Sequence, residues 1–293
     1  MKRILMLAAI AAISASAAMA QDFEKATNLA KQANEALVNG DSKTAIDNFT
    51  AALTEAGQCT EEEASSLIEN CKKGIAQANY SQANKLIENG SLEEAIAQLA
   101  ATVTAAEESG DSDLIEKAVE KTQQLHQAIA NAKIKAAGAE ADPAAKAAAY
   151  KNAIEHLDAV LAKEPENGKA FLQKGQVLSA IGDRAGAVET FLKAKELGQE
   201  TAANKQLSTI FLKDAAAKLK AKDFKGAVEA ALKSNEFLES ANAYKIAGTA
   251  ANGAKDIAAA EKYLSKYLEL APDAKDAAQI KTAVAALQAA LKK

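Results

Sequence analysis

The sequence predicts an all-α fold, a solenoid of stacked antiparallel helix hairpins. Three observations predict it. Alanine, which loses no side-chain entropy in a helix, fills about a quarter of the 293 residues. Only three prolines interrupt the chain, and strand-favouring residues are sparse. A short turn and a pair of small residues recur at a fixed spacing, which is the signature of a repeat protein.

The first twenty residues have the pattern of a secretory signal peptide. Lys2 and Arg3 precede an apolar run, and Ala18-Met19-Ala20 offers the small-x-small cleavage pattern. Cleavage after Ala20 removes both cations and changes the formal net charge from −4 to −6. The run is too short and too rich in alanine for a membrane span, and no cysteine offers a lipid anchor there. We therefore expect an exported mature chain, periplasmic or otherwise extracellular.

A turn signal recurs five times after residue 20, each time followed four residues later by alanine. The turns are Gly40-Asp41, Gly90-Ser91, Gly182-Asp183, Lys222-Asp223 and Lys255-Asp256. The alanines, with a sixth from a less regular unit, are Ala45, Ala95, Ala153, Ala187, Ala227 and Ala260. Each of the five alanines that follow a turn is preceded, twelve positions earlier, by another small residue. These residues are Ala33, Ala83, Gly175, Ala215 and Gly248. Chance would not preserve this register, so each unit is predicted to be a helix–turn–helix hairpin.

Each position in the hairpin has a physical role. Glycine at the turn can adopt the left-handed conformation that closes a helix. The Asp or Ser after it can cap the next helix, and Ser91 with Glu94 has the pattern of a capping box. The small residues let two helices approach closely, and an apolar residue four positions on fills the groove beside them. Because neither helix can bury its apolar stripe alone, the hairpins must stack.

These positions resemble the tetratricopeptide repeat (TPR) family, whose unit of about 34 residues carries Ala-x3-Phe and then Pro in its second helix. The matching residues are Ala45 with Phe49, Ala187 with Phe191, Ala153 with Leu157 and Pro165, and Ala260 with Leu264 and Pro272. The resemblance covers roughly residues 26–272, although no Trp opens any unit and Ala231 replaces the bulky core residue. It implies a right-handed superhelix, and with the signal peptide a bacterial secreted or periplasmic protein.

Uneven spacing between the alanines locates the insertions. We expect a helix that begins at Thr60, with Glu63 completing a capping box, and a loop at 107–113 that precedes a long helix. Asp142-Pro143 should cap and start the next helix. The predicted organisation is a signal peptide (1–20), two repeats with a helical extension (21–106), a spacer loop and long helix (107–142), repeats three to six (143–272) and a C-terminal capping helix (273–293).

No residue pattern predicts catalysis, a cofactor or a metal site. Gly248-x4-Gly253 lacks the Lys and the Ser or Thr of a phosphate-binding loop, and Asp111-Ser112-Asp113 lacks the remaining ligands of a calcium loop. His126 and His156 are expected on the surface or in a groove, and no acyl-transfer motif occurs. With a net negative charge and Arg184 as the one arginine after residue 20, the chain is not expected to bind nucleic acid.

The resemblance implies that the first helix of each unit lines a concave groove, where extended peptides or partner helices bind. Carried over by alignment, the groove candidates are Asn34, Tyr80, Asn84, Lys169, Gln176, Lys245, Thr249 and Asn252. Asn34 and Asn84 match asparagines with which some members hold a peptide backbone or a terminal carboxylate. Ala30 and Tyr80 stand where the accompanying lysines belong, which argues against a carboxylate clamp.

We expect a non-enzymatic scaffold that binds a protein or peptide partner in its groove in the cell envelope. The alternative is a structural component of an outer-membrane or secretion-related assembly, held through its convex face or its ends. An enzyme would need a compact polar pocket with strongly perturbed titrating groups. The sequence does not identify the partner, because groove residues of repeat proteins vary with little effect on the fold.

Cys59 and Cys71 favour two opposite interpretations. An oxidising compartment invites a disulfide. If one helix runs from Thr60 past Cys71, however, the two Cα atoms are roughly 18 Å apart, and a disulfide tolerates about 7 Å. The bond could form only if the helix began near Ala64 and the preceding residues folded back. We expect no intramolecular disulfide, with Cys71 in the core and Cys59 at a turn.

Overall fold

The computed structural model describes residues 21–59 and 62–292, and every regular element in these ranges is helical. More than three-quarters of residues 22–291 lie in helices, as predicted. In chain order the helices are residues 21–38 (the N-terminal helix), α2 (Ser42–Ala56), α3 (Glu62–Glu88), α4 (Leu92–Ser109), α5 (Ser112–Ala139), α6 (Pro143–Lys163), α7 (Gly168–Ile181), α8 (Arg184–Ala194), η1 (Lys195–Gln199), α9 (Glu200–Lys220), α10 (Phe224–Phe237), α11 (Ala241–Gly253), α12 (Ile257–Leu270) and α13 (Ala277–Leu291). The predicted signal peptide lies outside the described residues.

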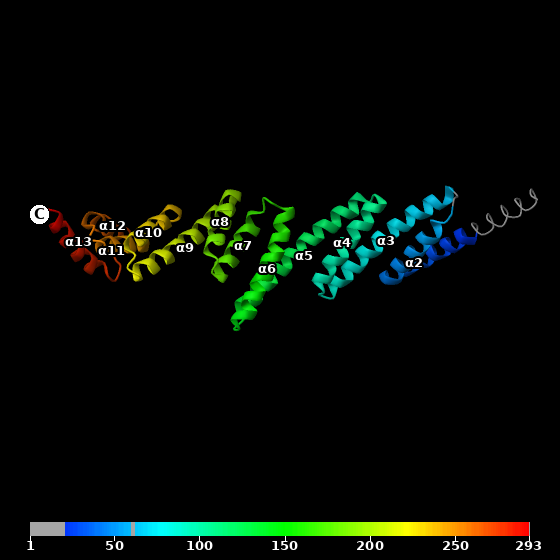
Figure 1. Ribbon diagram of the computed structural model, residues 1–293, viewed down its shortest axis with the longest axis horizontal. Coiled ribbons are helices and arrows are strands. Elements are labelled where there is room, and N and C mark those ends of the chain that lie inside the picture. The colour runs from blue at the N-terminus through cyan, green and yellow to red at the C-terminus, as the bar shows by residue number, and fades with distance from the viewer. Residues whose placement is uncertain (1–20, 60–61, 293) are drawn as a thin grey trace, which may run out of the picture. The chain divides into compact units, whose positions relative to one another are not determined.

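The described residues form two compact units, which divide between Ile129 and Ala130. Within each unit consecutive helices pack side by side, as Figure 1 shows for α3 with α4 and for α11 with α12. The first unit contains the N-terminal helix to α4 and most of α5, and the second contains the end of α5 and all later helices. The pairing confirms the predicted helix hairpins. The right-handed superhelix stays a prediction.

The repeated turns have the predicted backbone conformation. Left-handed φ angles occur at Gly40 (78°), Gly90 (81°) and Gly182 (88°), and also at the two lysines that replace glycine, Lys222 (63°) and Lys255 (64°). The Asp after the turn then caps the next helix: its carboxylate accepts from the backbone N–H three residues on, at 2.9–3.1 Å, for Asp41, Asp183, Asp223 and Asp256. Alignment of the turns therefore located the helix boundaries correctly.

The small residues lie where helices cross closely. All six repeat alanines are fully buried, and so are Ala33, Ala83 and Ala215. A Cβ added to Gly175 would come within 2.7 Å of the ring of Phe191, and one added to Gly248 within 2.6 Å of Leu264. Glycine is required at these two positions because the apolar side chain of the second helix lies directly against the backbone of the first. This packing is the pattern that defines a TPR-like hairpin.

Two local predictions are wrong. Ser91 precedes α4 but its hydroxyl makes no capping hydrogen bond, so the capping box with Glu94 does not form. The Ser240 hydroxyl does cap α11 by accepting from the Ala243 N–H at 3.3 Å, so the missing bond is particular to Ser91 and does not follow from the length of the serine side chain. The residues expected as a spacer loop, 107–113, form a tight turn at Gly110-Asp111 between α4 and α5. Asp111 accepts from the Leu114 N–H at 3.0 Å, so this turn repeats the Gly-Asp pattern.

Other boundaries agree with the sequence. Asp142 caps α6 by accepting from the Ala144 N–H at 2.8 Å, and Pro143 occupies the first turn. Helix α3 extends from Glu62 past Cys71, whereas Thr60 lies outside the described residues together with the side chain of Glu63. The segment expected to form a terminal cap contains α13. Its buried Val284 and Leu287 belong to one apolar cluster with Ala251, Ala260 and Leu264 of the last hairpin.

A polar network attaches the start of α13 to the same hairpin. Asp276 accepts from the hydroxyl of Tyr267 at 2.5 Å and pairs with the ammonium of Lys245, also at 2.5 Å. The hydrogen bond from Lys245, then that from Tyr267, lowers the pKa of the Asp276 carboxyl. Lys245, predicted as a groove residue, is thus engaged in holding the last helix.

Removal of the Asp276 charge should weaken this attachment. A lowered folded-state pKa means that the stabilisation is complete above the ordinary Asp pKa of about 3.9 and is lost as the pH falls through the lower folded value. Asp276→Asn is therefore expected to lower the Tm at pH 7. The difference in Tm between this variant and the wild type should narrow as the pH falls below about 3.9. Thermal unfolding followed by circular dichroism across pH measures this, and Asp273→Asn, in the same loop but exposed, is the control. A difference that is constant with pH would contradict the charge-based account.

The two glycine environments predict opposite effects of the same substitution. Gly175→Ala forces a methyl group into Phe191 and should destabilise by about 1–3 kcal/mol, the usual cost of overpacking. Gly138 is exposed near the end of α5 with open space around it, so Gly138→Ala should stabilise by about 0.5–1 kcal/mol through higher helix propensity. Urea unfolding of the two variants tests this. A neutral Gly175→Ala would mean that the helices do not approach as described.

Candidate interaction groove

The first unit has an open cavity of about 440 Å³ between the N-terminal helix and α3. Its apolar side is formed by Ala30, Phe49, Leu67, Cys71 and Gly74, and its polar side by Thr27, Lys31, Asn34, Asn70, Lys73 and Gln77. Asn34, one of the groove candidates from the sequence, lines this cavity. Its amide donates to the Ala30 carbonyl at 2.9 Å, which fixes the side chain along its own helix.

One face of α3 extends this surface beyond the cavity. Asn70, Lys73, Gln77, Tyr80 and Asn84 are spaced three or four residues apart and so share one side of the helix. The first three line the cavity, and the last two are the groove candidates predicted on this helix. The predicted residues thus belong to a continuous polar stripe on a first helix of a hairpin. We call this stripe, with the cavity and Lys121, the unit 1 groove.

Lys121 of α5 contacts the C-terminal end of the stripe on α3. Its ammonium donates to the side-chain oxygen of Asn84 at 2.8 Å and lies 5.4 Å from the centre of the Tyr80 ring. A cation above an aromatic face is attracted by the ring quadrupole, and the amide oxygen adds a hydrogen bond. These two contacts fix the position of a positive charge beside α3. The charge comes from α5, whereas on α3 itself Tyr80 stands where the family's lysine belongs.

The ionic groups that line the unit 1 groove are lysines: Lys31, Lys73 and Lys121. Lys73 pairs with Glu69 at 2.6 Å, and this hydrogen bond raises the pKa of the Lys73 ammonium. Asp111, at the start of α5, also acts electrostatically on Lys73. The Lys73–Glu69 pair is largely exposed and joins consecutive turns of one helix, so it holds the lysine only weakly.

The remaining groove candidates lie in the second unit. Lys169, Gln176, Thr249 and Asn252 are exposed on α7 and α11. The structure places a further polar pair there, because the Gln173 amide donates to Asn131 of α5 at 3.1 Å. Lys245 is the exception, since it pairs with Asp276.

Sequence reasoning missed most of the groove lining. Lys31, Asn70, Lys73 and Gln77 are polar residues in Ala-rich helices and match no family position. The signal that could have found the α3 residues is their 3–4 spacing with Tyr80 and Asn84. Lys121 could not have been found in this way because it reaches the stripe from another helix.

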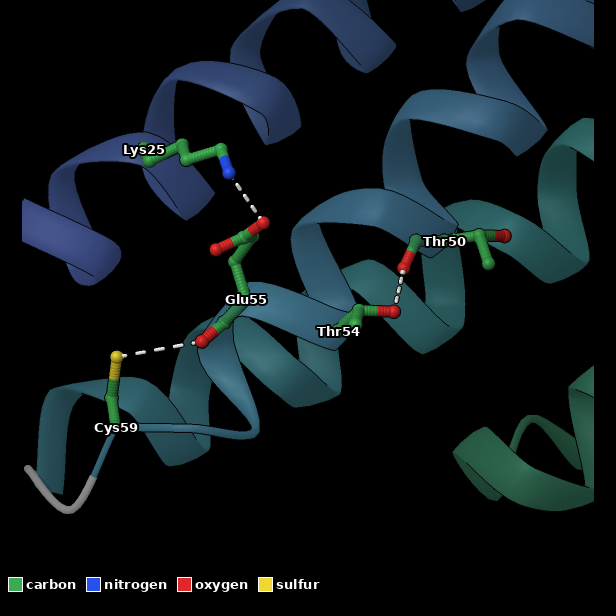
Figure 2. A network of polar contacts seen from close by, with 5 residues as sticks. All are labelled: Lys25, Thr50, Thr54, Glu55 and Cys59. Atoms are coloured by element: carbon green, nitrogen blue, oxygen red, sulfur yellow. Dashed lines mark hydrogen bonds and ion pairs between the residues drawn. The ribbon is translucent and has the colours of Figure 1, made fainter.

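Cys59 lies in the turn after α2, as predicted. Figure 2 shows Lys25 of the N-terminal helix reaching Glu55, with 2.6 Å between Nζ and Oε1, while the Cys59 thiol donates to the Glu55 carbonyl oxygen at 3.6 Å. Cys71 is fully buried in α3, and burial raises the pKa of its thiol. Both residues are thiols in the structure.

The two thiols should therefore differ in reactivity. Because the thiolate is the reactive form, iodoacetamide without reductant should modify partly exposed Cys59 in the native protein and Cys71 only after denaturation. Mass spectrometry of both samples counts the adducts. A denatured monomer with no adduct would show a disulfide and would contradict the continuous helix from Glu62 past Cys71.

Features that could suggest other chemistry have structural explanations. Gly248 and Gly253 lie within α11 and face Leu264 and Phe224, so they are packing positions rather than a phosphate loop. Across residues 21–59 and 62–292, no cluster of three or more His, Cys, Asp or Glu could hold a metal ion. His126 and His156 are partly buried on α5 and α6. Among the described helices none has both the length and the apolar character needed to cross a membrane.

Compared with protein-family models and with curated proteins, the sequence gives no match. Solved structures with similar arrangements include a MamA RS-1 ArsTM double mutant, with 20% identity over 58% of this chain and 96% of that chain and a TM-score of 0.35. PilW, a type IV pilus biogenesis factor, has 13% identity, covers 70% and 98%, and gives a TM-score of 0.34. Pseudomonas aeruginosa pilF has 14% identity, covers 89% and 99%, and gives a TM-score of 0.31.

These superpositions are loose, and the class of the protein rests on its own hairpins. Small residues at fixed spacing, left-handed turns and Asp caps recur in both units. The chain is an all-α repeat protein of the TPR-like kind.

Proposed function

We propose that this protein is a non-enzymatic interaction scaffold of the cell envelope, and that it binds a segment of a partner protein in the unit 1 groove. The observation that carries the proposal is the cavity between the N-terminal helix and α3, which combines an apolar wall with exposed amides and lysines. Ligand sites typically combine a concave apolar surface with a few polar groups that fix orientation.

The proposal that the scaffold is not an enzyme is supported by the chemistry of the groove. Its polar lining groups are lysines, amides, the Thr27 hydroxyl, one tyrosine and the buried Cys71 thiol, and two acids, Glu69 and Asp111, act on Lys73. No acid–base pair or nucleophile with a base lies among these lining residues. Such a surface can recognise and hold a polypeptide.

Position-specific photocrosslinking tests groove binding. A photoreactive phenylalanine analogue at Asn70, on the groove face of α3, should give discrete crosslinked species when the mature protein is expressed in its own envelope. The same analogue at Thr54, exposed on α2 and outside the cavity, is the matched control. Crosslinks from Thr54 but not from Asn70 would favour the alternative, a structural component held through another face.

Envelope location follows from the signal-peptide pattern of residues 1–20 and has its own test. Expression of the full chain in a bacterial host should yield a periplasmic protein whose N-terminus is Gln21. N-terminal sequencing after fractionation measures both properties. A cytoplasmic product that begins at Met1 would contradict the export proposal.

A further inference from the structure

We infer that the occupant of the unit 1 groove is an extended acidic peptide segment that carries one apolar anchor side chain, bound through side-chain carboxylates. This inference rests on the proposed groove function and specifies the chemistry of the partner. It follows from the shape of the cavity, the sign of its charges and the spacing between its charged positions.

The cavity is suited to an apolar anchor. Phe49 is 2% exposed and Cys71 and Gly74 are buried, so together they form a firm apolar surface at its base. Gly74 lets the Phe49 ring lie against the backbone of α3, since a Cβ there would approach the ring to 2.4 Å. Exposed Asn34 and Asn70 line the same cavity and can bond to a peptide backbone beside the anchor.

The charges favour an acidic partner. The whole chain has a formal net charge of −4, yet the ionic residues that line the groove are Lys31, Lys73 and Lys121. Two acids act on Lys73, namely Glu69, which pairs with it, and Asp111 at the start of α5. A local cationic surface on an anionic protein attracts acidic segments and repels basic ones.

Lys121 adds a charge that is already in position. One of its three ammonium donors is directed to Asn84, and the ammonium also makes a cation–π contact with the Tyr80 ring. A carboxylate can approach the other donors without the cost of ordering a flexible side chain.

The spacing of the charges sets the spacing in the ligand. Lys73 and Asn84, which binds Lys121, are separated along α3 by roughly 16 Å at the helical rise per residue. An extended chain covers that distance in about five residues. We therefore expect acidic residues about four to five positions apart, with the apolar anchor near the one that meets Lys31 and Lys73.

A single-stranded nucleic acid is also anionic, but the groove fits it poorly. Such ligands stack successive bases on aromatic side chains. Of the two aromatic residues of the groove, Phe49 is only 2% exposed and the face of Tyr80 is occupied by Lys121. Arginine, which recognises phosphate in two-point contacts, is absent from the lining. Twelve-nucleotide oligo(dT) therefore serves as a competitor in the test.

Selection from a display library of random twelve-residue peptides on the mature protein tests the inference. The enriched pool should be rich in Asp and Glu and should contain one recurrent Leu, Ile, Met or Phe. A synthetic peptide of the enriched sequence should lose at least tenfold in affinity for Lys31→Glu/Lys73→Glu and for Lys121→Glu. The control Lys43→Glu/Lys281→Glu makes the same charge change at exposed positions outside the groove and should stay within twofold.

Three further measurements make each result decisive. Circular dichroism confirms that each variant folds, and Lys31→Glu alone replaces the double variant if Lys73→Glu unfolds. Asn70→Trp, which fills the cavity, should weaken binding of the peptide and leave its acidic preference intact. C-terminal amidation of the peptide should have no effect, because side-chain carboxylates are the ligands.

The failures are distinguishable. Neutral or basic peptides that lose binding in Asn70→Trp would overturn the inference and leave the groove function standing. Acidic peptides that weaken equally in the control variant, or that oligo(dT) displaces, would also overturn it, since binding would then be non-specific attraction or phosphate recognition. If no peptide responds to any groove variant, both the inference and the proposed groove function are wrong.

Discussion

The close approach of paired helices at small residues is the constraint on which the structure depends. Phe49, Phe191 and Leu264 project from second helices onto the backbones of first helices, at Gly74, Gly175 and Gly248. An added methyl group at any of these glycines would collide with the facing side chain. The fully buried alanines of the other repeats have the same role in a less extreme form. Because the contact is local to a hairpin and its neighbour, stability is shared among many small interfaces.

This arrangement explains the composition of the chain. Alanine gives helices high propensity and lets them pack closely, but each alanine buries little apolar area. The stability that large side chains would otherwise provide is concentrated in a few positions, such as Phe49 and Phe191, and in the turns. In two of these turns a lysine, Lys222 or Lys255, adopts the left-handed φ that glycine adopts in the others. The Asp cap that follows each of these lysines satisfies a backbone donor at the start of the next helix.

Separation of core and groove gives the fold its capacity for binding. On the surface of α3 the stripe from Asn70 to Asn84 lies between Gly74, which packs against Phe49, and the fully buried Ala76 and Ala83. The groove lining can therefore carry lysines and amides whose identity is not required for packing. Lys245 shows the limit of this separation, because a first-helix position became part of the attachment of α13.

The sequence by itself determined the helix hairpins, their boundaries and their core. Left-handed turns and Asp caps depend on residues within one turn of the chain, and small residues at fixed spacing reveal close packing, so Gly40, Asp41 and Ala45 could be interpreted directly. Local pattern failed at Ser91, which has the sequence of a capping box but whose hydroxyl makes no capping hydrogen bond. Only the tertiary structure decided the groove: it brought Lys121 of α5 onto Tyr80 and Asn84 of α3, and it placed Lys31 and Asn34 across from Asn70 and Lys73. These contacts join residues far apart in sequence, and no local propensity or spacing encodes them.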